Sequence, residues 1–66
     1  MRVRVNGEDK ETQNGSTLKA LLDGLSIRPE GIAVEVNREI VPKRTWEDAV
    51  LKDGDTIEIV RMTGGG

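Results

Sequence analysis

The sequence predicts one α+β domain, in which a mixed β-sheet is covered on one face by one main helix and carries a short helical turn. Three observations support this fold class. Apolar residues alternate in several short segments, one segment carries leucines at helical spacing, and turn residues separate these segments. A length of 66 residues is enough for one such domain.

The first strand is predicted near the start of the chain, where Val3 and Val5 alternate with Arg2 and Arg4. This alternation places the valines on one face of a strand and the arginines on the other. Asn6-Gly7 follows, and both residue types tolerate the positive φ that a two-residue hairpin turn requires. We therefore expect the polar segment after this turn to return antiparallel as an edge strand.

A helix is predicted after the breaker Asn14-Gly15, with Ser16 as its N-cap. Leucines recur there at the spacing i, i+3, i+4 and i+7, which forms one apolar face of a helix. The members of this face are Leu18, Leu21, Leu22 and Leu25. A helix with a single apolar face packs on a sheet, so this one is expected to cover the inward strand residues.

The next strand is predicted from the alternation of Ile32, Val34 and Val36. Asn37-Arg38 is expected to form a two-residue turn into a short strand. Pro42 ends that strand, because proline lacks the N–H that a sheet ladder requires.

A single helical turn is predicted after this strand. Thr45 followed by Asp48 resembles a capping box in which Asp replaces the usual Glu. The turn from Trp46 to Val50 is then expected to bury Trp46 together with Val50 or Leu51. We interpret Trp46 as a core residue rather than a binding residue, because the domain otherwise has a small core.

The last strand is predicted over residues 56–62. Ile57 and Ile59 face the core, whereas Val60 and Met62 face the opposite side. The resulting order is strand, strand, helix, strand, strand, short helix, strand. This is the order of the β-grasp, or ubiquitin-like, fold, in which the last strand lies centrally beside the first.

The residue composition argues against several kinds of active site. The chain has no cysteine and no histidine, so it lacks a thiol nucleophile, the commonest general base and the commonest metal ligand. A net charge of -2 and a single aromatic residue disfavour nucleic-acid binding. No segment has the apolar length of a membrane span or of a signal-peptide core. We expect a cytoplasmic protein without catalytic or metal-binding residues, and without nucleic-acid or membrane partners.

The chain ends in Gly64, Gly65 and Gly66, after a domain predicted over residues 1–63. Two interpretations of this flexible tail over residues 64–66 are a frayed end and a working carboxylate. A terminal carboxylate is ionised at neutral pH and is a poor electrophile, so it requires activation, most simply as an acyl-adenylate. Glycines have no Cβ, so the tail is able to thread a narrow channel and approach a nucleotide closely. On the second interpretation, Gly66 is the reacting residue.

Val60 and Met62 lie just before this tail, on the face that the lone helix leaves uncovered. They are candidate partner-docking residues, although single exposed apolar residues are also common on protein surfaces. Arg2 and Arg4 are predicted to share that face on the neighbouring strand, and Arg61 lies where the tail begins. These arginines either steer acidic partners or are solvated edge residues.

The chain resembles the sulfur carrier proteins of thiamine biosynthesis, the ThiS family, most specifically in the run VNREIVPKRTWEDAVLKDGDTIEIVRMTGGG. The resemblance extends over the whole chain, but in the first half only the pattern of elements matches. It implies that an E1-like adenylyltransferase uses ATP and Mg to adenylate Gly66. A sulfur donor such as a cysteine desulfurase then supplies the sulfur of a thiocarboxylate, which thiazole synthase consumes. The chain itself is then a non-catalytic carrier, expected as a monomer without a bound cofactor.

Other functions stay open at this point. Related sulfur carriers serve molybdopterin synthesis, tRNA thiolation, or cysteine and methionine synthesis. A ubiquitin-like modifier would use the same activation but attach Gly66 to a lysine of another protein. A plain interaction or RNA-binding β-grasp module would make no use of the glycines.

Overall fold

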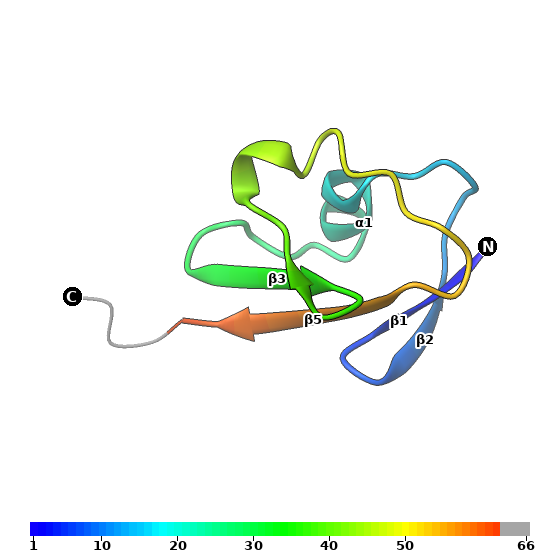
Figure 1. The fold of residues 1–66 in the computed structure, drawn as a ribbon, viewed down its shortest axis with the longest axis horizontal. Coiled ribbons are helices and arrows are strands. Elements are labelled where there is room, and N and C mark those ends of the chain that lie inside the picture. Colours follow the sequence, from blue (N-terminus) through cyan, green and yellow to red (C-terminus); the bar gives the residue numbers. More distant parts are fainter. Residues whose placement is uncertain (63–66) are drawn as a thin grey trace.

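A computed structural model of the chain describes residues 1–62. Its strands form one five-stranded sheet in the order β2-β1-β5-β3-β4 (Figure 1). The elements are β1 (Arg2–Val5), β2 (Glu8–Glu11), α1 (Leu18–Gly24), β3 (Ile32–Val36), β4 (Glu39–Ile40), the 3-10 helix η1 (Lys43–Thr45) and β5 (Thr56–Arg61). The predicted fold class and order of elements are confirmed. In this part of the chain, no helix has the length and apolarity needed to cross a membrane.

The last strand occupies the centre of the sheet. β5 runs parallel to β1, with Arg4 opposite Thr56, and antiparallel to β3, with Val34 opposite Ile59. The helix α1, η1 and the long segment before β5 all lie on one side of the sheet (Figure 1). The other side is left open by the described residues, as the single apolar face of the helix predicts.

The core lies between α1 and the covered face of the sheet. Its buried hydrophobic residues are Val3, Val5, Leu18, Leu21, Leu22, Ile32, Val34, Trp46, Leu51 and Ile57. The prediction that Trp46 is a core residue is confirmed: it is 2% exposed, and its indole Nε1–H donates to the Val41 carbonyl at 2.8 Å. Of the two further candidates, Leu51 belongs to the same core and Val50 is exposed.

Two hairpin turns confirm the turn predictions. Asn6 and Gly7 have φ values of 50° and 85°, and Asn37 and Arg38 have φ values of 53° and 72°. Positive φ at both central residues is the requirement of a two-residue turn that matches the twist of its strands. The polar strand β2 is therefore set antiparallel at one edge of the sheet, and the short strand β4 at the other.

The predicted N-cap of the helix is wrong by one residue. Thr17 caps α1, since its Oγ1 accepts from the Ala20 N–H at 3.1 Å. The side chain of Ser16 bonds to the preceding loop instead, because its Oγ donates to the Gln13 carbonyl at 2.7 Å. The carbonyl of Ser16 also accepts from the Leu51 N–H at 2.8 Å. A long-range backbone contact therefore delays the start of the helix by one residue.

The predicted capping box is also wrong. The helical turn lies before Trp46, at Lys43–Thr45, and its N-cap is Pro42. Thr45 ends this turn, and its Oγ1 donates to the Pro42 carbonyl at 2.8 Å rather than pairing with Asp48. Pro42 has φ -59°, and a fixed φ of this size suits the start of a helical turn. The same proline thus ends one element and begins the next.

Candidate functional site

The residues predicted to react or to form the tail, Gly64, Gly65 and Gly66, lie outside the described residues. The description ends at Met62, directly after β5. The Met62 N–H donates to the Gly31 carbonyl at 2.8 Å, so the chain stays bonded to the β3 side up to this point. The sheet therefore holds the base of the predicted site at one end of its central strand.

An asparagine side chain extends the bonding between β1 and β5. The Asn6 N–H donates to the Ile57 carbonyl at 2.9 Å. Its side-chain Oδ1 then accepts from the Ile59 N–H at 2.7 Å, and its Nδ2 donates to the Ile59 carbonyl at 3.4 Å. The amide of Asn6 thus replaces the backbone of a further β1 residue. Sequence reasoning identified Asn6 only as a turn residue.

A buried carboxylate holds the start of β5. Asp55 is 9% exposed and is the buried charged side chain in the described part of the chain. Its Oδ1 accepts from Asn37 Nδ2 at 3.0 Å, and its Oδ2 accepts from the Lys52 N–H at 2.7 Å. Asn37 Oδ1 in turn accepts from the Thr56 N–H at 3.0 Å. This network joins the β3–β4 turn to β5, whereas the sequence indicated only two separate turns.

The open face of the sheet carries exposed apolar residues near the end of β5. Val60 is 53% exposed and Met62 is 57% exposed, which confirms the prediction that both side chains lie outside the core. Ala33 lies directly opposite Val60 on β3. Ile40 on β4 belongs to the same face and is 69% exposed, but sequence reasoning did not single it out. We call Ala33, Ile40, Val60 and Met62 the open-face patch.

Two carboxylates lie beside the open-face patch. Glu35 on β3 is directly opposite Glu58 on β5. Like charges at directly opposed positions of a sheet repel each other. Within residues 1–62, neither carboxylate forms an ion pair with a basic side chain. The open face therefore combines apolar side chains with an uncompensated negative charge.

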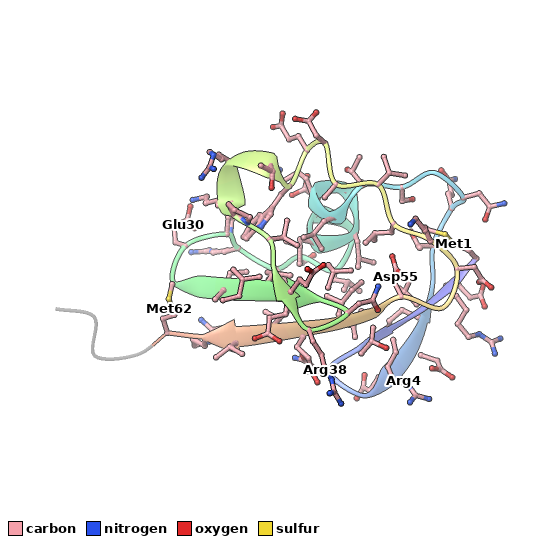
Figure 2. All side chains as sticks on the ribbon, in the orientation of Figure 1. Met1, Arg4, Glu30, Arg38, Asp55 and Met62 are labelled. Atoms are coloured by element: carbon pink, nitrogen blue, oxygen red, sulfur yellow. The ribbon has the colours of Figure 1, made fainter. Side chains whose placement is uncertain are left out.

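The structure does not bring the predicted arginines Arg2 and Arg4 to the open-face patch. Arg4 lies opposite Thr56, and Val60 follows four residues later, which is about 13 Å along a strand. Arg4 and Met62 lie at opposite ends of the molecule (Figure 2). These arginines share the open face, but they lie too far away to join the same contact.

The same two arginines are engaged by neighbouring carboxylates. Arg2 Nε is 3.1 Å from Glu11 Oε1, and Arg4 Nε is 3.4 Å from Asp9 Oδ1. Both pairs link β1 to β2 and are exposed, so each contributes little to stability. These contacts favour the interpretation of Arg2 and Arg4 as solvated residues, although their strand lies next to the edge strand rather than at the edge itself.

Arg61 lies at the same end of the sheet as Val60 but on the other face. It is directly opposite Ile32, whose side chain is buried on the helix side. Residues that are directly opposite in a sheet point to the same face, so Arg61 also points to the helix side. Of the predicted docking residues, only Val60 and Met62 therefore form one surface.

Comparison with known proteins gives consistent matches over the whole chain. Residues 3–66 match the model of the ThiS family. The sulfur carrier protein ThiS of Escherichia coli K12 is 32% identical over 66 residues, with 100% of both chains covered. A crystal structure of a thiamine biosynthesis protein (ThiS) from Geobacter metallireducens has a TM-score of 0.89 and 29% identity, again with 100% of both chains covered.

A longer relative also matches. A thiazole synthase of Magnetococcus marinus is 42% identical over 66 residues. The match covers 100% of this chain but only 20% of the length of that relative.

Proposed function

The chain belongs to the ThiS family of sulfur carrier proteins of thiamine biosynthesis, and from this premise we propose that the Gly66 carboxylate is the group that carries the sulfur. The protein is a carrier and has no catalytic site of its own. The observation that supports the proposal most strongly is the family match, which extends through the three glycines to residue 66.

The proposed reaction needs two changes at the Gly66 carboxyl group. A carboxylate oxygen first bonds to the α-phosphate of ATP, and pyrophosphate leaves. The terminal sulfur of the donor's persulfide then displaces AMP from the carbonyl carbon and forms an acyl disulfide. A thiol of a partner protein attacks the other sulfur of this S–S bond, so that the thiocarboxylate leaves and the two thiols are oxidised to a disulfide. We assign ATP and Mg to an E1-like adenylyltransferase and the sulfur to a donor such as a cysteine desulfurase. The carrier contributes the end group, which follows β5 in the chain.

Thiazole synthase is the proposed acceptor of the sulfur. The Magnetococcus marinus protein of that name contains a stretch similar to this whole chain. A carrier-like segment and the rest of that protein therefore share one polypeptide, which supports a partnership. As part of the same proposal, the carrier acts as a monomer in the cytoplasm, where ATP is available for its activation.

The proposal is tested by the intact mass of the purified protein. After incubation with ATP, Mg, the adenylyltransferase and a sulfur source, we expect a mass gain equal to the exchange of one oxygen for sulfur. Deletion of Gly66 is expected to abolish this gain without changing the circular dichroism spectrum. A Gly66→Ala variant keeps the chain length and tests whether the partner channel tolerates a Cβ. Conjugation to a lysine of another chain, or no mass change, would contradict the proposal.

We also propose that the open-face patch docks the adenylyltransferase. Val60→Asp is expected to raise the KM for this carrier by roughly tenfold or more, because a charge would enter an apolar contact. The fold is expected to persist, since Val60 is already 53% exposed. Arg2→Ala is the control, because Arg2 shares the open face at the distant end, and its KM is expected to stay within about twofold. Equal KM values for the two variants would rule out the patch.

A further inference from the structure

The central strand β5 extends beyond its neighbour β1. β1 ends at Val5, opposite Ile57, whereas β5 continues to Arg61. The side chain of Asn6 bonds to both backbone groups of Ile59 and so fills the next position of the ladder. Beyond Asn6, this edge of β5 has no neighbouring strand among the described residues.

The backbone of Arg61 points to this open edge. The N–H of Met62 donates to the Gly31 carbonyl, just before β3, and Val60 lies two residues before Met62 with its backbone on the same side of the strand. Backbone groups of successive strand residues point to alternate sides, so the N–H and C=O of Arg61 point away from β3. On that side the pairing of β1 with β5 ends at Val5 and Ile57, so within residues 1–62 no strand faces these two groups. The edge thus offers one donor and one acceptor in the geometry of a sheet.

A cleft adjoins this edge on the helix side of the sheet. Its volume is about 470 Å³. The apolar part of its lining includes Leu25, Ile27, Ile32 and Ile59, and the polar part consists of Asn6, Glu8, Lys10 and Arg61. Leu25 and Ile27 follow α1, whereas Ile32 and Ile59 belong to the sheet. A strand added beside Arg61 would direct every second side chain toward this cleft. Edge and cleft together fit an extended segment with an aliphatic side chain.

We infer that an extended segment of thiazole synthase adds to the sheet as a further strand at Arg61, with an aliphatic side chain in this cleft. The inference rests on the proposed function, in which thiazole synthase takes sulfur from Gly66. The added strand would lie beside the chain that leads to Gly66, and so would hold the carrier where its end group is used. A thiazole synthase that contains a similar segment in one polypeptide favours this partner over the adenylyltransferase.

The test removes one backbone donor by chemical synthesis of the chain. An ester in place of the amide between Val60 and Arg61 eliminates the Arg61 N–H. We expect the Kd for the thiazole synthase of the same organism to rise roughly three- to tenfold, as the loss of one hydrogen bond implies. The control is an ester between Glu8 and Asp9, since the Asp9 N–H points outward from the edge strand β2. Each ester also makes one backbone carbonyl of the sheet a weaker hydrogen-bond acceptor. The two variants are therefore matched in this side effect and differ only in the N–H that is removed.

Hydrogen exchange of the Arg61 amide gives a second readout on the unmodified chain. We expect fast exchange in the free carrier and protection when thiazole synthase is saturating. Equal Kd values for both esters, with no protection of Arg61, would overturn the inference. A mass gain at Gly66 would still support the proposed function in that case. Protection that rises with the concentration of the carrier alone would assign the edge to a second copy, and would also overturn the inference.

Failure of thiazole synthase to bind the unmodified chain would overturn both the inference and the partner assignment. The sulfur gain at Gly66 does not depend on thiazole synthase. The mass experiment therefore separates failure of this contact from failure of the carrier function itself.

Discussion

Trp46→Ala is expected to destabilise the domain by about 3–5 kcal/mol, the usual range for a buried aromatic residue replaced by alanine. Trp46 is 2% exposed and packs among the core residues, so its loss leaves a cavity. A domain of 66 residues buries a modest core, so this loss is a large part of its free energy of unfolding. Urea unfolding followed by circular dichroism measures the change, because the variant has no tryptophan fluorescence.

Trp46→Phe separates the two contributions of this side chain. Phenylalanine retains much of the apolar volume but lacks the indole N–H, so the Val41 carbonyl loses its donor. We expect a smaller loss of about 1–2 kcal/mol. An alanine variant within about 1 kcal/mol of the natural chain would contradict the assignment of Trp46 to the core.

Asp55→Ala is expected to lower the free energy of unfolding by about 2–4 kcal/mol. The change leaves Asn37 Nδ2 and the Lys52 N–H without their acceptor in a largely buried place. An unsatisfied buried donor costs about 1–3 kcal/mol, and partial hydration reduces the sum for two donors. Urea unfolding at neutral pH measures the effect.

Asp53→Ala is the matched control for the buried carboxylate. Asp53 belongs to the same turn, but it is exposed, and its Oδ1 accepts only from the Arg2 N–H at 2.8 Å. We expect a loss below about 1 kcal/mol. A double-mutant cycle of Asp55→Ala with Asn37→Gly should give a coupling of about 1 kcal/mol, because glycine accepts the positive φ of Asn37. If the two substitutions changed the free energy of unfolding additively, Asp55 and Asn37 would not be energetically coupled.

Local patterns in the sequence predicted the fold. The alternation of Val3 and Val5, the spaced leucines and the turn pairs Asn6-Gly7 and Asn37-Arg38 each specify one element without knowledge of its neighbours. The orientation of Val60 and Met62 followed from the same two-residue period of a strand. These predictions succeeded because every one of them depends on residues adjacent in the chain.

The details that the sequence did not predict depend on partners far along the chain. Thr17 replaces Ser16 as N-cap because the backbone of Ser16 is bonded to Leu51. The bonds of Asn6 to Ile59 likewise join residues that are 53 positions apart. An asparagine in a turn has the same local pattern whether or not a distant strand passes its side chain. These contacts become visible only when the topology is known.

The register between strands also limited the prediction of the site. The two-residue period of a strand placed Arg4 and Val60 on one face. This period gives no information on the distance between two residues of neighbouring strands. The register sets Arg4 opposite Thr56, at the far end of β5 from Met62. The predicted docking residues therefore lie on or next to two neighbouring strands but do not form one surface.

The parallel pairing of β1 with β5 also has a mechanical consequence. The start of β1 and the end of β5 lie at opposite ends of the molecule (Figure 1). A pull on these two points acts along the strands and loads the hydrogen bonds between them together, in shear rather than one after another. The domain is therefore expected to resist extraction of its central strand, which is held by β1 at its start and by β3 from Ile57 to Arg61.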